Sequence, residues 1–107
     1  MSFIPTTIED FITYSKTKSS TLMVIDFKAS WCAPCKSIKP FIEYLKEQYT
    51  NVEFYEIDIE DENTATITST FDIQKLPTFV YYKNGNICKS IIGVNKGNIE
   101  ELVNEYL

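Results

Sequence analysis

The chain has 107 residues, of which 44% are hydrophobic and 14% aromatic, a composition typical of one folded domain spanning residues 1–107 rather than of a disordered segment. Ten lysines, no arginines and fifteen acidic residues give a net charge of −5, which argues against nucleic acid or an anionic membrane surface as a partner. No stretch approaches the roughly 18 apolar residues that a membrane-spanning helix needs.

The amino-terminal part of the chain predicts a helix, which Thr6 or Thr7 can cap. The apolar positions of this helix, which we expect to face inward, are Ile8, Phe11 and Ile12. A polar stretch then ends the helix. The apolar run over residues 22–28 predicts a buried strand that contains one carboxylate, Asp26.

A second helix is predicted to begin beside Cys32 and to run to about Tyr49. Its apolar residues recur at helical spacing and comprise Ile38, Phe41, Ile42 and Leu45. Pro40 lies inside this helix, so we expect a kink there. Residues 52–59 then alternate in the pattern of a second central strand.

The carboxyl-terminal half predicts a helix, a hairpin and a last helix. Residues 62–71 follow an acidic start but are rich in threonine, a weak helix former. Asn84-Gly85 between two apolar runs predicts a hairpin of strands 79–82 and 87–92. Asn95 can cap the last helix, whose apolar face comprises Ile99, Leu102, Val103 and Tyr106. Strands separated by helices pair in parallel, so we expect an α/β fold: a mixed central sheet with helices on both faces.

Two cysteines, Cys32 and Cys35, are separated by two residues where the first strand gives way to a helix. The free N–H groups and positive dipole end of that helix stabilise a thiolate on Cys32, which is also nearer the open side of the turn. This arrangement favours dithiol–disulfide chemistry with Cys32 as the nucleophile. A zinc site is the alternative, but a chain without histidine would have to recruit Cys88 and a carboxylate as ligands, which is uncommon. Cys88 is most simply a small, partly buried residue.

The number and context of the cysteines bear on the compartment. Three cysteines, an odd number, do not match the disulfide framework of a secreted protein. The first residues lack the basic segment and the long apolar segment of a secretory signal. We therefore expect a reducing compartment, most simply the cytosol.

Taken together, these motifs resemble the thioredoxin family over essentially the whole chain. The matching residues occur in order and are Asp26-Phe27, Trp31-Cys32-Ala33-Pro34-Cys35-Lys36, Ile38-Lys39-Pro40, Asp58, Leu76-Pro77-Thr78-Phe79, Lys83-Asn84-Gly85 and Gly93. The resemblance implies a thioredoxin fold and the reduction of disulfides in other proteins. It also implies a redox-active disulfide with no bound cofactor, and re-reduction by a thioredoxin reductase that draws on NADPH. We expect a monomer.

The carboxylate of the first predicted strand, Asp26, has a predicted part in this chemistry. A carboxylate in an apolar strand costs several kcal/mol if it stays ionised there, so the pKa of Asp26 should rise. We expect Cys35 to be the resolving thiol and Asp26 to accept its proton through a water molecule. The alternative is that Asp26 ends the strand and points to solvent.

Another set of residues is expected to contact the substrate, and comprises Trp31, Ala33, Pro34, Leu76, Pro77 and Gly93. The family implies a cis peptide bond at Pro77, packed against the dithiol, although an ordinary trans proline also suits this position. The family further implies that the Leu76 backbone pairs with an extended substrate peptide. For Trp31 the alternative is core packing, and for Gly93 it is a plain turn rather than the close approach of a substrate backbone.

Three positions depart from the family pattern. Ala33 stands where glycine is usual and should make the turn more rigid. Lys28 stands where tryptophan is common, and Glu56 where lysine is often found. None of these changes removes a catalytic group.

Lys36, Lys39 and Glu56 are expected to modulate the site. Lys39 lies four residues after Cys35 and therefore shares its helix face, so its ammonium group is expected to approach Asp26. With an acid at position 56, Lys39 would be the main positive charge near that carboxyl. The alternative is that Lys39 extends to solvent.

Two other classes of function remain as alternatives. A non-catalytic binding module with this fold is one, although the intact dithiol and Asp26 argue against it. A glutathione-linked, glutaredoxin-like enzyme is the other, and Trp31 and Ala33-Pro34 argue against that.

Overall fold

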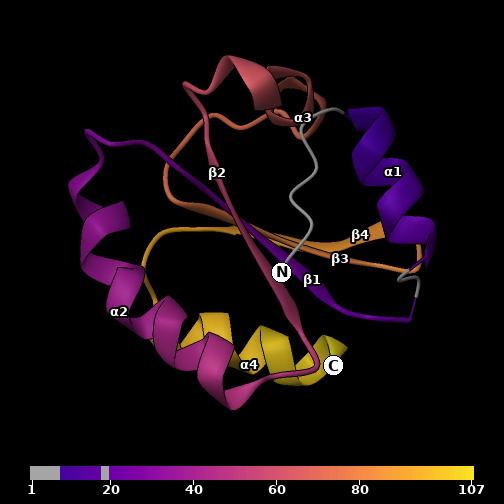
Figure 1. Cartoon of the computed structure of the whole chain (residues 1–107). Helices are drawn as coiled ribbons and strands as arrows, with labels where there is room; N and C mark the ends of the chain where they lie inside the picture. The colour runs from indigo at the N-terminus through magenta and orange to yellow at the C-terminus, as the bar shows by residue number, and fades with distance from the viewer. Residues whose placement is uncertain (1–7, 18–19) are drawn as a thin grey trace.

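A computed structural model describes residues 8–17 and 20–107. The caps predicted at Thr6 or Thr7 and the side chain of Ile8 lie outside this description. The elements in chain order are α1 (Ile8–Thr17), β1 (Met23–Lys28), α2 (Ala33–Gln48), β2 (Glu53–Asp58), the 3-10 helix η1 (Glu62–Thr64), α3 (Ala65–Thr70), β3 (Thr78–Lys83), β4 (Asn86–Ile92) and α4 (Lys96–Tyr106) (Figure 1).

The strands form one mixed sheet. Over the described residues its order is β2-β1-β3-β4, with β1 parallel to β2 and antiparallel to β3, and with β3 antiparallel to β4. Helices α2 and α4 cover one face, and α1 and α3 lie on the other (Figure 1). The predicted mixed sheet with helices on both faces is confirmed.

Alternation along β1 divides its side chains between two cores. Val24 packs with the buried apolar faces of α2 and α4, which comprise Ile38, Ile42, Leu45, Ile99, Leu102 and Val103. Ile25 and Phe27 pack on the opposite face, with residues of α1 and α3. Because side chains two apart share a face of the sheet, Asp26 lies on the α2 side with Val24.

Local sequence features fix the ends of several elements as predicted. Asn84 (φ 55°) and Gly85 (φ 77°) both adopt the left-handed conformation that a tight hairpin turn requires. The side-chain oxygen of Asn95 accepts a hydrogen bond from the backbone N–H of Asn98 at 3.0 Å and so caps α4. The hairpin and the last helix are therefore confirmed together with their residues.

Other predictions for the helices need correction. Ile12 was expected to face inward, but 42% of its surface is exposed, because the buried stripe of α1 runs through Phe11 and Ser15. The helix predicted over 62–71 is split into η1 and the six-residue α3, in keeping with its many threonines. Pro40 lies inside α2, where a kink stays a prediction. Among the helices described, none is long and apolar enough to cross a membrane.

Candidate active site

A disulfide joins Cys32, the N-cap residue of α2, to Cys35 in its first turn, with Cα atoms 5.3 Å apart. The backbone N–H of Cys35 donates a hydrogen bond to the Sγ of Cys32 at 3.2 Å. A free N–H group at a helix start thus points at this sulfur. When the bond is reduced, the N–H and the helix dipole favour a thiolate on Cys32.

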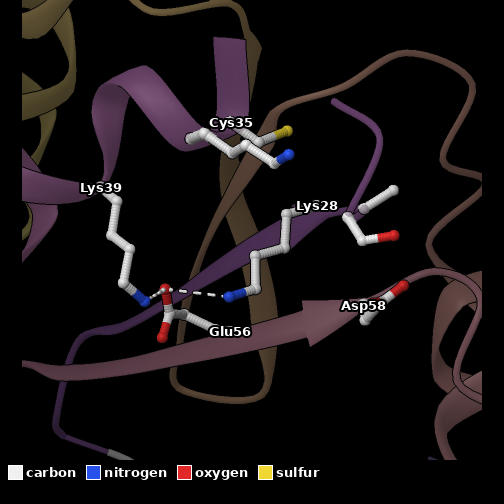
Figure 2. A pocket seen from close by; sticks show the side chains of 8 residues that line it. Lys28, Cys35, Lys39, Glu56 and Asp58 are labelled. Atoms are coloured by element: carbon white, nitrogen blue, oxygen red, sulfur yellow. Dashed lines mark ion pairs between the residues drawn. The ribbon is translucent and has the colours of Figure 1, made fainter. Parts of the chain in front are cut away.

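The two sulfurs open to different surroundings, although Cys32 and Cys35 are only 4% and 6% exposed. The exposed fraction does not distinguish the two cysteines, but the cavities that they line do. Cys32 lines a groove of about 520 Å³, here called the apolar groove, together with Trp31, Ala33, Pro34, Ile59, Ile73, Gln74, Lys75, Leu76 and Ile92. Cys35 lines a cavity of about 260 Å³, here called the charged cavity, with Lys28, Ala29, Ser30, Lys36, Lys39, Glu56 and Asp58 (Figure 2).

Trp31 forms an exposed edge of the apolar groove. Its surface is 65% exposed, so the alternative of core packing is excluded. Ile92, at the end of β4, is also exposed and lines the same groove. Two large apolar side chains therefore face solvent beside the disulfide, which is typical of a contact surface.

Pro77 and Gly93 are hydrogen-bonded neighbours, and each adjoins a residue that lines the groove, Leu76 and Ile92. The peptide bond between Leu76 and Pro77 is cis, as the family resemblance implies. The backbone N–H of Gly93 donates to the carbonyl oxygen of Pro77 at 3.0 Å. Gly93 has φ 104°, a conformation that favours glycine, and a Cβ added there would meet nothing within 4 Å. Leu76 packs against the two cysteines.

Asp26 lies beneath α2 in the middle of β1, with 6% of its surface exposed, so the alternative of a solvent-facing residue is excluded. Its Oδ1 is buried and has no hydrogen-bond partner among the described residues. The pKa of Asp26 is raised to about 7, chiefly by burial and also by the negative charge of Glu56, while Lys28, Lys46 and Lys39 act to lower it.

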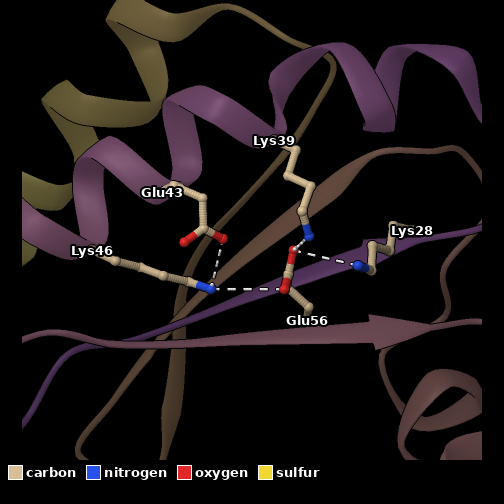
Figure 3. Close-up of polar contacts among 5 residues, drawn as sticks. All are labelled: Lys28, Lys39, Glu43, Lys46 and Glu56. Atoms are coloured by element: carbon tan, nitrogen blue, oxygen red, sulfur yellow. Dashed lines mark hydrogen bonds and ion pairs between the residues drawn. The ribbon is translucent and has the colours of Figure 1, made fainter.

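The carboxylate of Glu56 forms ion pairs with three lysines (Figure 3). The Nζ atoms of Lys28 and Lys39 lie 3.3 and 3.7 Å from its Oε1, and the Nζ of Lys46 lies 3.7 Å from its Oε2. Burial acts to raise the pKa of Glu56, but the three lysines together hold it below its usual value. Glu56 therefore remains ionised beside Asp26 at neutral pH.

The prediction that Lys39 is the main positive charge near Asp26 is wrong. Lys28 and Lys46 each lower the pKa of Asp26 more than Lys39 does. The side chain of Lys39 is 56% exposed, so water screens its charge more strongly than it screens the two less exposed lysines. Lys36 is exposed at the edge of the charged cavity.

Several residues at the site were not identified from the sequence. Ile59, Ile73 and Ile92 line the apolar groove, and Lys46 contacts Glu56. Lys46 follows Lys39 by seven residues, two helical turns, so the shared helix face was available as an indication. No group of three or more His, Cys, Asp or Glu among the described residues is arranged to hold a metal ion.

Comparison with known proteins decides the family. The thioredoxin family model matches residues 3–105. A curated thioredoxin of Ophiophagus hannah is 42% identical over 88 residues, which are 82% of each chain, and that of Homo sapiens is 42% identical over 86 residues, 80% of each chain. The chain belongs to the thioredoxin family.

Solved thioredoxin structures share its fold. The structure of Fasciola hepatica thioredoxin superposes with a TM-score of 0.89 at 26% identity, covering 99% of this chain and 100% of that one. Plasmodium falciparum thioredoxin gives 0.80 at 32% identity, covering 95% and 96%. As a thioredoxin-family member with the Cys32–Cys35 pair, the chain is a thiol–disulfide oxidoreductase that reduces protein disulfides.

Proposed function

We propose that Cys32 is the nucleophile, Cys35 the resolving thiol and Asp26 the proton acceptor of this reaction. The Cys32 thiolate attacks one sulfur of a client disulfide, which forms a mixed disulfide and displaces a client thiolate that then takes up a proton. Cys35 gives its proton to Asp26 and attacks the Sγ of Cys32. This step forms the Cys32–Cys35 disulfide and releases the second client thiolate, so two electrons pass to the client.

The position of Cys32 is the observation that carries the assignment of roles. Its sulfur accepts the N–H of Cys35 at the start of α2 and lies on the apolar groove, where a client can approach. Cys35 opens instead to the charged cavity, on the side of α2 under which Asp26 lies. Nucleophile and proton acceptor thus act from opposite sides of the disulfide.

Asp26 suits the transfer of a proton from Cys35. Its pKa of about 7 keeps a fraction of this carboxyl ionised, and therefore able to accept a proton, near neutral pH. Its buried Oδ1, which lacks a partner among the residues described, can accept a hydrogen bond from a water molecule that bridges to the thiol.

Clients are proposed to bind as extended segments across the apolar groove. The Leu76 backbone before the cis proline pairs with the client backbone, as in the addition of a strand to a sheet edge. The open space beside Gly93 admits a second stretch of client backbone. Trp31 contributes apolar contact, and Ala33 and Pro34 form the edge next to Cys32.

The oxidised protein is proposed to regain its electrons from a thioredoxin reductase, with NADPH as their source. The redox-active disulfide is then the carrier in a short electron-transport chain, and the protein itself binds no cofactor. The whole chain acts as one thioredoxin domain, as a monomer in the cytoplasm, where reducing conditions keep it supplied with electrons.

Insulin reduction coupled to NADPH consumption tests the proposed function. Turnover is expected to require both a thioredoxin reductase and this protein, and to fail in Cys32→Ser. A folded protein that binds clients but consumes no NADPH would indicate the binding module instead. Turnover with glutathione as sole reductant would indicate the glutaredoxin-like alternative.

A further inference from the structure

Two carboxyl groups lie side by side beneath α2. The parallel register of β1 and β2 pairs Asp26 with Glu56 and Lys28 with Asp58. Asp26 is buried and its Oδ1 has no partner within the described part of the chain, whereas Glu56 is surrounded by ammonium groups. Of two paired positions on neighbouring strands, Glu56 therefore forms ion pairs with three lysines, whereas the Oδ1 of Asp26 has no hydrogen-bond partner among the described residues.

The three cations reach Glu56 from two different elements. Lys28 extends from β1, two residues beyond Asp26 on the same face of the sheet. Lys39 and Lys46 extend from α2, which lies above that face. Figure 3 shows the three side chains converging on Glu56 from both sides, so this one carboxylate connects β1, β2 and α2.

Without a carboxylate at their centre, these ammonium groups would repel one another. Lysine side chains are long and flexible, and those of Lys28, Lys39 and Lys46 are all partly exposed. Each can therefore extend into solvent at low cost. Their position over Asp26 depends on Glu56.

We propose that Glu56 is a positioning residue for the resolving step, because it holds the ammonium groups of Lys28, Lys39 and Lys46 over the buried carboxyl of Asp26, on the side of the disulfide where Cys35 lines the charged cavity. The inference rests on the proposed role of Asp26 as proton acceptor. Lys28 is the key cation, because it makes the shortest of the three contacts with Glu56 and lines the same cavity as Cys35 (Figure 2).

Within the described ranges 8–17 and 20–107, the charged groups that shift the pKa of Asp26 are Glu56 and the three lysines around it. Lys28 comes from β1 itself, Glu56 from β2, and Lys39 and Lys46 from α2. The partner of Asp26 on β3 is Phe79, which carries no charge. The carboxyl of Asp26 thus experiences one negative charge and the cations that this negative charge keeps nearby.

A double-mutant cycle separates positioning from simple proximity. The pKa of Asp26 is measured by carboxyl NMR in the reduced protein. Lys28→Met removes a cation near Asp26 and is expected to raise this pKa by on the order of 1. In a Glu56→Gln background, where Lys28 is no longer held, the same substitution is expected to raise it by less than half as much.

Glu43→Gln provides the matched control background. Glu43 is also a carboxylate and pairs with Lys46 at 3.3 Å, but it lies away from Lys28 (Figure 3). Lys28→Met should keep its full effect there. Both Glu56→Gln and Lys28→Met preserve side-chain size, and Lys28→Gln repeats the cycle if the methionine perturbs folding.

The pH profile of mixed-disulfide resolution supplies the kinetic measurement. Its midpoint in Lys28→Met should rise with the pKa of Asp26, so that resolution at pH 6 slows by up to about tenfold. Equal effects of Lys28→Met in the wild-type and Glu56→Gln backgrounds would overturn the positioning role of Glu56. An Asp26→Asn variant that keeps the wild-type profile would instead overturn the proposed proton role of Asp26.

Discussion

The two sides of the disulfide differ in almost every physical respect. The apolar groove beside Cys32 is wide and has exposed aliphatic and aromatic side chains at its edges. The charged cavity beside Cys35 has half that volume and is lined by lysines and carboxylates. The disulfide therefore lies between two surfaces: an apolar one suited to contact with a protein client, and a charged one suited to proton transfer.

This difference shows how a single helix turn can divide a reaction into two parts. Contact with a client requires dry, apolar surface, whereas proton transfer requires charges held at fixed positions. Cys32 and Cys35 are bonded to each other across one helical turn, yet Cys32 lines the apolar groove and Cys35 lines the charged cavity. The comparison predicts that substitutions in the apolar groove impair client binding, whereas substitutions in the charged cavity impair proton transfer.

Replacing each cysteine by serine in turn has the largest expected effect and tests the comparison most directly. Cys35→Ser should accumulate mixed disulfides with clients through Cys32, because no thiol remains on the cavity side to resolve them. Multiple turnover should fall by more than about a hundredfold. Cys32→Ser should trap far fewer clients, as measured by non-reducing electrophoresis after client capture. Equal trapping by the two variants would contradict the division of roles.

Asp26 tests the cavity side through stability. Because its pKa in the folded protein, about 7, exceeds the ordinary value of 3.8, its contribution to stability is complete below pH 3.8 and is lost as the pH rises through 7. The free energy of unfolding of Asp26→Asn should therefore exceed that of the wild type by about 4 kcal/mol at pH 8, so that the variant is more stable there. At pH 3.5 the two should be almost equally stable. Urea denaturation of the oxidised protein at both pH values measures this. A gain of the same size at both would show that burial of the charge is not its cause.

Trp31 tests the apolar groove separately from proton transfer between Cys35 and Asp26. Trp31→Ala removes a large exposed contact and should lower kcat/KM for protein clients by about tenfold, chiefly through KM. The free energy of unfolding should change by less than about 0.5 kcal/mol, because the side chain is mostly exposed. The pH profile should keep its midpoint. A shifted midpoint would mean that the two sides are not separate.

Local rules predicted much of this molecule from the sequence. The hairpin at Asn84-Gly85 and the cap at Asn95 depend on residues a few positions apart, and both were correct. The dithiol at a helix start follows from the same kind of short-range pattern.

Charge pairing across strands was beyond prediction. Glu56 meets Lys28 only through the register of β1 with β2, which no local pattern specifies. Which lysine acts most strongly on Asp26 also depends on how far each side chain is exposed, a property of the assembled surface. The exposure of Ile12 likewise depends on how α1 packs in the assembled fold: the helical pattern predicts that it is buried, but it is 42% exposed.

Cys88 gives the smallest expected effect, because it lies on neither side of the disulfide. It is a partly buried residue of β4 that packs against the core beneath α4. Cys88→Ser should leave turnover in the insulin assay within about twofold of the wild type, since it lacks the helix start that activates Cys32. A large loss in a folded variant would reveal a second redox centre.

The N-cap of α2 couples the redox state of the Cys32–Cys35 pair to the stability of the first helical turn. Cys32 caps the first turn of this helix through a sulfur that accepts an N–H group, and it is on this sulfur that the helix start favours a thiolate when the disulfide is reduced. A thiolate accepts hydrogen bonds more strongly than a disulfide sulfur, so the helix start tightens as electrons arrive. A capping contact is worth about 1 kcal/mol, which corresponds to about 20 mV for a two-electron couple. Any change that frays or extends this turn therefore also moves the reduction potential.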